Sequence, residues 1–497
     1  MTNSTTILRG TIWSAIGLWG RRLIGFAVFT ILARHVEPAS LGLAAIAIMC
    51  ISFMELLSRQ GVGLALIQRS GLNSALLSTA FYLNMATASL LVLINLLFAP
   101  QIARFMGEPG LTPILRVLSV VVIMSASNVV PVAIQSKSFD FRSITIQTFS
   151  GTAASALVSI PLAILGYEVW ALAVQSVTFA IVNSLTIWLR TTWRPSAVFI
   201  VKECKSLTTF SLKILLNSII NFAKRRLDQF LIGIALGPAG LGLYALGLKF
   251  SETIESFVKA PLNQVAFPAF SLIKNHPIRL QNVLVRAMKI NAVAMMPILS
   301  GIALLAPEVI VIFFGERWSG AVFVCIILTL RKLAESLFFL NYHVFISQGF
   351  AGTLNTLQIL HMVGIAISTT IGKQWGIEGV AIGGLLVTMI FNVISVICLS
   401  VRTHISIWPL LDSLKNPFFA SIAMGTSIQI TRMLFISGDL NPVFSVAVLI
   451  PLGVITYIFS LQLLSPQLLK DTLELIQSVR QKKVYSKGPE KPTLLKS

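Results

Sequence analysis

Two clusters of basic residues lie inside long apolar runs of the sequence. They are Arg21 and Arg22 in the run 11–33, and Lys224, Arg225 and Arg226 in the run 210–237, which also contains Lys213. A charge at the centre of a bilayer costs about 2.5–3.5 kcal/mol even on lenient insertion scales, so such clusters must face water, an anion or a partner charge. Guanidinium groups are always charged and grip phosphate through two parallel hydrogen bonds. We therefore predict that these six residues line a cationic cavity that binds an anionic head group, for which a diphosphate is well suited.

Other charges in the apolar runs have an oppositely charged residue four positions away. The pairs are Glu55 and Arg59, Glu255 and Lys259, Lys224 and Asp228, and Arg331 and Glu335. This spacing places both members on one face of a helix. Two interpretations stay open: the pairs neutralise each other, or one of the acids Glu55, Asp228 and Glu255 is the proton or sodium site that couples transport to an ion gradient.

Residue patterns typical of enzymes and metal sites do not occur. The cysteines Cys50, Cys204, Cys325 and Cys398 are widely spaced and fit no metal or redox motif. There is no phosphate-binding loop, nucleophile elbow or pair of loop carboxylates, and the histidines are not clustered. We therefore predict no catalytic residue, no metal, no cofactor and no ATP hydrolysis.

The elements that hold these charges are predicted to be membrane helices. Hydrophobic residues make up 55% of the chain and charged residues 11%, whereas soluble domains carry about a quarter charged residues. A crossing helix needs about 20 apolar residues. Fourteen such runs are expected, at 11–33, 41–66, 75–98, 111–135, 144–165, 168–189, 208–236, 241–270, 284–306, 318–346, 354–372, 377–401, 416–436 and 443–464. The fold class is therefore an all-α polytopic membrane protein.

The distribution of Lys and Arg predicts the orientation of the chain. With the N-terminus inside, most Lys and Arg outside the runs lie in inner segments, and the outer loops hold only Arg34, Arg104, Arg317 and Lys373. Such a bias marks the cytoplasmic side, so both termini are expected there, without a cleaved signal peptide. Inner loops and a cationic cavity explain the net charge of +20 better than a nucleic-acid partner does.

An internal repeat relates the two halves of the chain at an offset of about 200 residues. Leu41-Gly42-Leu43 matches Leu241-Gly242-Leu243 after a Pro-containing turn, Arg21-Arg22 matches Arg225-Arg226, and Glu55 matches Glu255. Six spans in each copy give both copies the same orientation, which predicts two lobes related by a pseudo-two-fold axis along the membrane normal, with the substrate path between them. The expected boundaries are an N-lobe at 1–190, a cytoplasmic linker at 191–207, a C-lobe at 208–402, two added spans at 403–465 and a basic cytoplasmic tail at 466–497.

These features resemble the oligosaccharide flippases of the multidrug/oligosaccharidyl-lipid/polysaccharide exporter superfamily, in the branch of colanic acid and succinoglycan exporters. The resemblance covers roughly residues 10–400. Besides the span number, the repeat and the Arg pairs, it is carried by Trp13, Leu32-Ala33-Arg34, Pro38, Leu41-Gly42, Gly61 and the segment Lys137 to Arg142 with Phe139-Asp140-Phe141-Arg142.

The resemblance implies a substrate and a setting. It implies an undecaprenyl-diphosphate-linked oligosaccharide that is moved by alternating access across the bacterial inner membrane, for exopolysaccharide, capsule or O-antigen (lipopolysaccharide) biosynthesis. It also implies glycosyltransferases, a polymerase and a chain-length regulator as partners in the same pathway. Three alternatives stay open: a peptidoglycan-precursor flippase or a multidrug antiporter of the same fold and, from a different class, a membrane polysaccharide polymerase or ligase.

Overall fold

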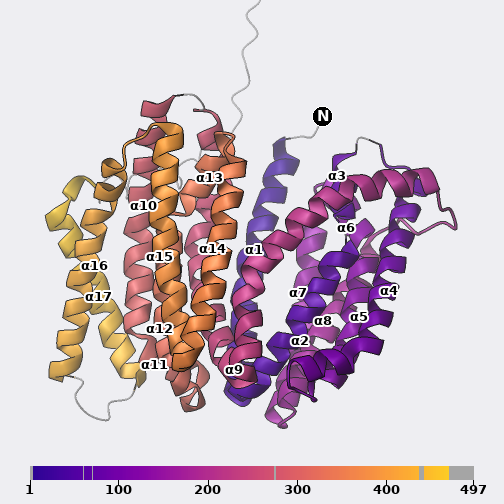
Figure 1. Cartoon of the computed structure of the whole chain (residues 1–497), viewed down its shortest axis with the longest axis horizontal. Helices are drawn as coiled ribbons and strands as arrows, with labels where there is room; N and C mark the ends of the chain where they lie inside the picture. The colour runs from indigo at the N-terminus through magenta and orange to yellow at the C-terminus, as the bar shows by residue number, and fades with distance from the viewer. Residues whose placement is uncertain (1–3, 60, 70, 274–275, 436–441, 469–497) are drawn as a thin grey trace, which may run out of the picture. The chain divides into compact units, whose positions relative to one another are not determined.

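Helices joined by short turns make up the structure, a computed structural model (Figure 1). It describes residues 4–59, 61–69, 71–273, 276–435 and 442–468, and no β-strand occurs in these ranges. The all-α fold class is therefore confirmed. The tail expected at 466–497 lies outside the described residues from position 469 onward.

Most predicted spans are single helices. They are α1 (Ser4–His35), α4 (Ser74–Phe105), α7 (Phe141–Ile164), α8 (Glu168–Arg190), α10 (Pro277–Leu304), α14 (Ala351–Gly372), α15 (Gly376–Thr403), α16 (Trp408–Phe435) and α17 (Pro442–Leu464). Local sequence explains two of their starts. Asn73 accepts a hydrogen bond from the Leu76 amide (2.7 Å) at the start of α4, and Asp140 accepts one from the Ser143 amide (3.1 Å) at the start of α7. Such caps satisfy amides that have no partner within the helix.

Three predicted spans are broken into shorter helices. The span 41–66 becomes α2 (Pro38–Arg59) and α3 (Val62–Gln68), with Gly61 between them at a φ of 75° that favours glycine. The span 111–135 becomes α5 (Leu111–Ser127) and α6 (Val129–Lys137). The span 318–346 becomes η1 (Glu316–Ala321), α12 (Val322–Leu337) and α13 (Phe339–Ser347), after the short α11 (Ala306–Phe314); a second short helix, η2 (Lys373–Trp375), precedes α15.

The longest element, α9 (Val201–Ser271), contains two predicted spans and a turn between them. Gly237 is non-helical, with φ 69° and ψ −173°, and Pro238 begins the second arm, where its missing N–H is no loss. The turn brings the Tyr244 hydroxyl to within 2.7 Å of an Asp228 carboxylate oxygen. The helix begins at Val201, so part of the expected linker 191–207 is helical.

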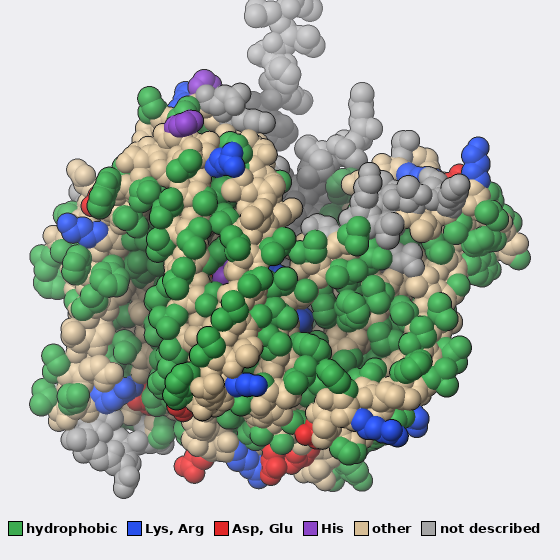
Figure 2. Space-filling view, in the orientation of Figure 1, with side chains coloured by type: hydrophobic (Ala, Val, Ile, Leu, Met, Phe, Trp, Pro, Cys, Tyr) green, Lys and Arg blue, Asp and Glu red, His purple; other side chains and the backbone are tan. Residues whose placement is uncertain are grey.

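Apolar side chains cover much of the outer surface. By length and composition, eight helical stretches of the described chain could cross a membrane; two of them, Ile214–Lys259 and Ala351–Thr403, each run across two predicted spans. Figure 2 shows many hydrophobic side chains at the surface that faces the viewer. An apolar surface of this kind, with exposed side chains such as Leu97, Leu157 and Ile455, suits helices surrounded by lipid. The number of fourteen crossings stays a prediction.

Contacts divide the chain into two compact units. The first unit comprises Met1–Phe257, Ile310–Arg331 and Asn355–Phe391, and the second comprises Val258–Val309, Lys332–Leu354 and Asn392–Ser497. In the first, helices α2, α5, α9 and α12 share a core that includes Ile46, Leu115, Ile232 and Leu328. In the second, α10, α16 and α17 pack together, and the Tyr457 hydroxyl donates to the Val293 carbonyl (3.1 Å). The division into two repeat lobes stays a prediction.

Within the first unit, the two Leu-Gly-Leu motifs of the repeat pack against each other. A Cβ atom on Gly42 would lie 1.8 Å from the Pro238 carbonyl oxygen, and a Cβ atom on Gly242 would lie 1.8 Å from the Pro38 carbonyl oxygen. Only glycine allows this backbone approach. Because the two contacts are reciprocal, a local two-fold axis relates the two motifs, as in a symmetric interface.

Candidate functional site

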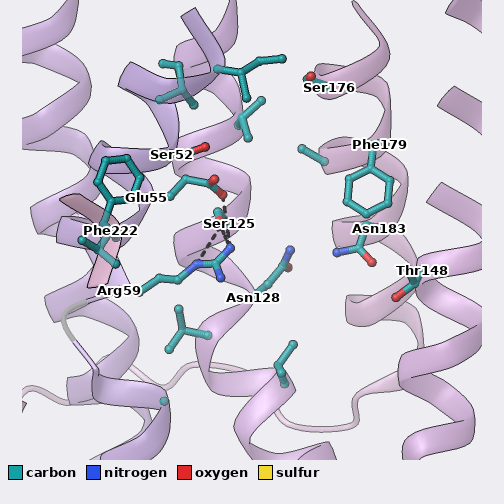
Figure 3. Close-up of a pocket in the computed structure, with 18 of the residues that line it drawn as sticks. Ser52, Glu55, Arg59, Ser125, Asn128, Thr148, Ser176, Phe179, Asn183 and Phe222 are labelled. Atoms are coloured by element: carbon teal, nitrogen blue, oxygen red, sulfur yellow. Dashed lines mark hydrogen bonds and ion pairs between the residues drawn. The ribbon is translucent and has the colours of Figure 1, made fainter. Parts of the chain in front are cut away.

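A cavity of about 1460 Å³ lies among the helices of the first unit. Its walls come from α1, α2, α3, α5, α6, α7 and α8, all in the first copy of the repeat, and from α9, in the second copy. Figure 3 shows part of it, with α2 and α5 on one side and α7 and α8 on the other. The size suits a ligand well above a simple ion, since drug-sized ligands occupy cavities of about 300–1,000 Å³.

The charged groups that line this cavity are mostly cations. They are Arg59 on α2 and Arg225, Arg226 and Lys249 on α9, with the carboxylates Glu55 and Glu252. A cleft with an excess of one sign of charge and low-dielectric walls concentrates counter-ions. The lining therefore favours an anion.

Arg59 is the best-defined of these cations. Its Nη2 lies 3.2 Å from Glu55 Oε1, its Nε lies 3.1 Å from Ser125 Oγ, and Nη2 also donates to that hydroxyl (Figure 3). The side chain is nevertheless 56% exposed. A guanidinium has five N–H donors, so Arg59 keeps donors for a ligand while it holds these contacts.

The predicted substrate residues divide into three groups. Arg225 and Arg226 line the cavity, where Arg226 donates to Gln229 Oε1 (2.9 Å). Lys224 and Arg22 are not among the residues that line it; Lys224 is exposed on α9, and Arg22 donates to the Ser256 carbonyl of α9 (2.8 Å). The side chains of Arg21 and Lys213 lie outside the described residues.

The acids and cations predicted as ion-coupling or charge-pairing residues also differ in their surroundings. Glu55 and Arg59 form the ion pair described above. Asp228 is buried outside the cavity, where Tyr244 (2.7 Å) and Arg331 (3.4 Å) donate to Oδ2.

The second charged pair of the repeat is Glu255 and Lys259. Glu255 is buried. The Lys259 ammonium lies 4.9 Å from the centre of the Phe339 ring in the second unit, which is a cation–π distance.

Sequence reasoning did not identify several lining residues as part of the site. Lys249 and Glu252 carried a usable signal, because charges three positions apart in a membrane helix need a polar surrounding. Uncharged residues such as Asn183 and Phe179, which line the same cavity, carried none, because packing between helices uses the same residue types. Within the described ranges, no three His, Cys, Asp or Glu side chains come together as a metal site would require.

Known proteins with similar sequences carry names from polysaccharide biosynthesis. The chain is 23% identical over 435 residues to the succinoglycan biosynthesis transport protein ExoT of Rhizobium meliloti. This match covers 87% of this chain and 85% of that protein. It is 23% identical over 402 residues to the lipopolysaccharide biosynthesis protein WzxC of Escherichia coli, with 78% and 80% covered.

Solved structures share the fold. The lipid II flippase MurJ, in an inward closed conformation, matches with a TM-score of 0.74 and 15% identity over 92% of this chain and 100% of that chain. An inward-facing multidrug resistance transporter of the MATE family matches with a TM-score of 0.60 and 16% identity over 79% and 98%. Both likenesses agree with the polytopic helical fold. Residues 31–323, more than half of the sequence, match the family of polysaccharide biosynthesis proteins, and the chain belongs to that family.

Proposed function

We propose that the protein is a flippase for lipid-linked oligosaccharides. It moves undecaprenyl-diphosphate-linked repeat units from the inner to the outer leaflet of the bacterial inner membrane, for the synthesis of exopolysaccharide, capsule or O-antigen. The observation that carries the proposal is the lining of the cavity, in which four cations outnumber two carboxylates inside a helical membrane protein of this family. A diphosphate linked to a neutral glycan supplies the anion that such a lining favours.

In this mechanism, the cations of α9 hold the head group. Arg225 and Arg226 are adjacent, and their guanidiniums grip phosphate oxygens in the bidentate geometry that lysine cannot reproduce. The cavity has walls from both copies of the repeat. Motion of one copy relative to the other therefore exposes the bound head group to each side of the membrane in turn, as in other transporters with repeats. Both termini lie in the cytoplasm in this proposal.

The ion pair of Glu55 and Arg59 links binding to a driving ion in the same proposal. A phosphate that approaches Arg59 competes with the Glu55 carboxylate, which is 3.2 Å away. Displacement of Glu55 leaves a carboxylate that can take up a proton or a sodium ion from the cavity. In this proposal, Glu55 is the residue that couples transport to one of these ions, and no resident cofactor takes part.

Two other transporter functions share the architecture. A peptidoglycan-precursor flippase is the second candidate, because the lipid II flippase MurJ matches over its whole chain with a TM-score of 0.74. A multidrug antiporter for cations fits less well, since the lining repels a cationic drug. A polymerase or ligase is disfavoured because the similar proteins and structures are named as a transport protein, a flippase and a transporter. Glycosyltransferases, a polymerase and a chain-length regulator are the proposed pathway partners.

The test is a double Arg225→Gln/Arg226→Gln variant in a bacterium that lacks its own polysaccharide exporter. We expect polymer export to fall below a tenth of the wild-type level and the lipid-linked repeat unit to accumulate, while the amount of protein in the membrane stays the same. Arg317→Gln, which removes an exposed cation outside the cavity, is the matched control and should export normally. Normal export by the double variant would overturn the proposal. Rescue of a strain depleted of its lipid II flippase, but not of the exporter strain, would favour the second candidate.

A further inference from the structure

The charged and neutral side chains of the cavity lie on different walls. Every Lys, Arg, Asp and Glu among the lining residues comes from α2 or α9. The wall formed by α7 and α8 has polar groups without charge, which are Thr148, Thr152, Ser155, Gln175, Ser176 and Asn183, together with the ring of Phe179. Figure 3 labels four of these residues, Thr148, Ser176, Phe179 and Asn183. The cavity is therefore divided into a cationic half and a neutral polar half.

The hydroxyls of the neutral wall are oriented as acceptors. Thr148 donates to the Ile144 carbonyl (2.9 Å), and Thr152 donates to the Thr148 carbonyl (2.8 Å). Ser155 donates in the same way to the Thr152 carbonyl at 2.9 Å. A hydroxyl that gives its proton to its own helix still has a lone pair, so these oxygens can accept hydrogen bonds from a ligand. Their spacing of three and four residues keeps them on one face of α7.

Two amides on α8 supply donors on the same wall. Neither Gln175 nor Asn183 makes a side-chain hydrogen bond to another described residue, although both line the cavity. Each carboxamide offers two N–H donors and a carbonyl acceptor. A polar group left without a partner in a membrane interior is costly, so these amides are satisfied by what fills the cavity.

An aromatic ring lies between these amides. Phe179 is packed against Gly151 of α7, where a Cβ atom would come within 3.0 Å of ring atom Cδ2 and 3.2 Å of the Phe179 carbonyl oxygen. Gly151 thus sets how far the ring extends into the cavity. A flat apolar ring beside hydrogen-bonding groups offers burial to the C–H face of a sugar and partners to its hydroxyls.

We propose that the α7–α8 wall is the glycan subsite and that it takes uncharged sugars. The inference rests on the proposed function, in which Arg225 and Arg226 hold the diphosphate. The first sugar is bonded to that diphosphate and so lies within reach of the opposite wall. Acceptor hydroxyls on α7 and donor amides on α8 match sugar hydroxyls, which both donate and accept. None of the described lining residues on this wall is a cation that could balance the negative charge of an acidic sugar.

The test compares lipid probes with and without a sugar. Purified protein in nanodiscs is titrated with undecaprenyl diphosphate, and with the same lipid bearing one glucose, galactose or N-acetylglucosamine. The readout is Kd by microscale thermophoresis. We expect wild type to bind at least one glycosylated probe more tightly than the bare lipid. In the double variant Gln175→Ala/Asn183→Ala, the ratio of the Kd for the bare lipid to the Kd for that probe should fall roughly tenfold, while the Kd for the bare lipid stays unchanged. Gln101→Ala removes an exposed amide of α4 outside the cavity and should keep the preference.

A second variant covers the case in which the double variant does not fold. Gly151→Ala keeps both amides but pushes the Phe179 ring toward the cavity, and it should reduce the preference for glycosylated probes. Equal Kd values of wild type for all four probes, or a full preference retained by either variant, would overturn the glycan subsite. If instead the proposed function is wrong, the double variant Arg225→Gln/Arg226→Gln should bind the bare lipid with the same Kd as wild type.

Discussion

Removal of the Arg331 charge tests how the first unit is held together. Arg331 Nη1 lies 3.4 Å from Asp228 Oδ2 and 3.0 Å from the Tyr244 hydroxyl, and the Arg331 and Asp228 side chains are only 10% and 11% exposed. Gly384 of α15 leaves room for the guanidinium, since a Cβ atom there would lie 3.1 Å from Nη1. The group joins both arms of α9 to α12.

The size of the effect follows from this geometry. At an effective dielectric constant of about 20, two charges 3.4 Å apart attract by about 5 kcal/mol. Desolvation offsets much of that in the intact pair, but loss of one partner leaves the other charge buried without its counter-charge, which costs about 3–5 kcal/mol. Arg331→Met keeps most of the apolar stem, so its effect reports mainly the lost charge. We expect the free energy of unfolding to fall by about 3–5 kcal/mol.

The assay is unfolding in mixed dodecyl maltoside and SDS micelles, followed by tryptophan fluorescence. The single variants Arg331→Met and Asp228→Asn are compared with the double variant, which should be about 2–3 kcal/mol more stable than the sum of the single effects predicts. Arg317→Met, at an exposed cation, should change the free energy of unfolding by less than about 0.5 kcal/mol. The reasoning fails if Arg331→Met is as stable as wild type, or if the two single effects add without coupling.

Three further predictions concern two glycines and one side-chain hydrogen bond of the first unit. Gly42→Ala should lower the unfolding temperature and the membrane yield strongly, because its Cβ would lie 1.8 Å from a carbonyl oxygen, whereas Gly352→Ala, with open space, should behave as wild type. Equal yields would contradict the close contact. Gly237→Ala should cost about 1–3 kcal/mol of unfolding free energy, because its φ of 69° and ψ of −173° lie in a region that is almost restricted to glycine; an unchanged value would refute the strain. Trp318→Phe should cost about 1 kcal/mol in the same assay by removing an indole donor 2.7 Å from an α1 carbonyl, and no change would count against that bond.

Local chemistry made much of the fold predictable. The run expected at 75–98 lies inside α4 (Ser74–Phe105), and the turn expected between 236 and 241 occurs at Gly237. Both follow from properties of short stretches, because a membrane helix satisfies its own backbone hydrogen bonds and glycine and proline interrupt it. The match between Gly42 and Gly242 was also visible in the sequence, although their reciprocal contact was not.

The site itself was predictable only in part. An excess of cations in apolar runs predicted a polar interior, and Arg225 and Arg226 do line the cavity. The same reasoning gave Arg22 the same role, yet its guanidinium donates to a carbonyl of α9. A charge in a membrane helix needs a polar partner, and sequence spacing does not say whether a ligand, a side chain or a backbone group provides it.

The sequence by itself determined the helices, the turns between them and the excess of positive charge, because each depends on residues close together in the chain. Only the tertiary structure decided that Asp228 meets Arg331, 103 positions away, and that the neutral residues of α7 and α8 line the same cavity as the cations of α9. The physical reason is that these contacts depend on how each helix is rotated about its axis and packed against others. That rotation is set by the close fit of many side chains at once.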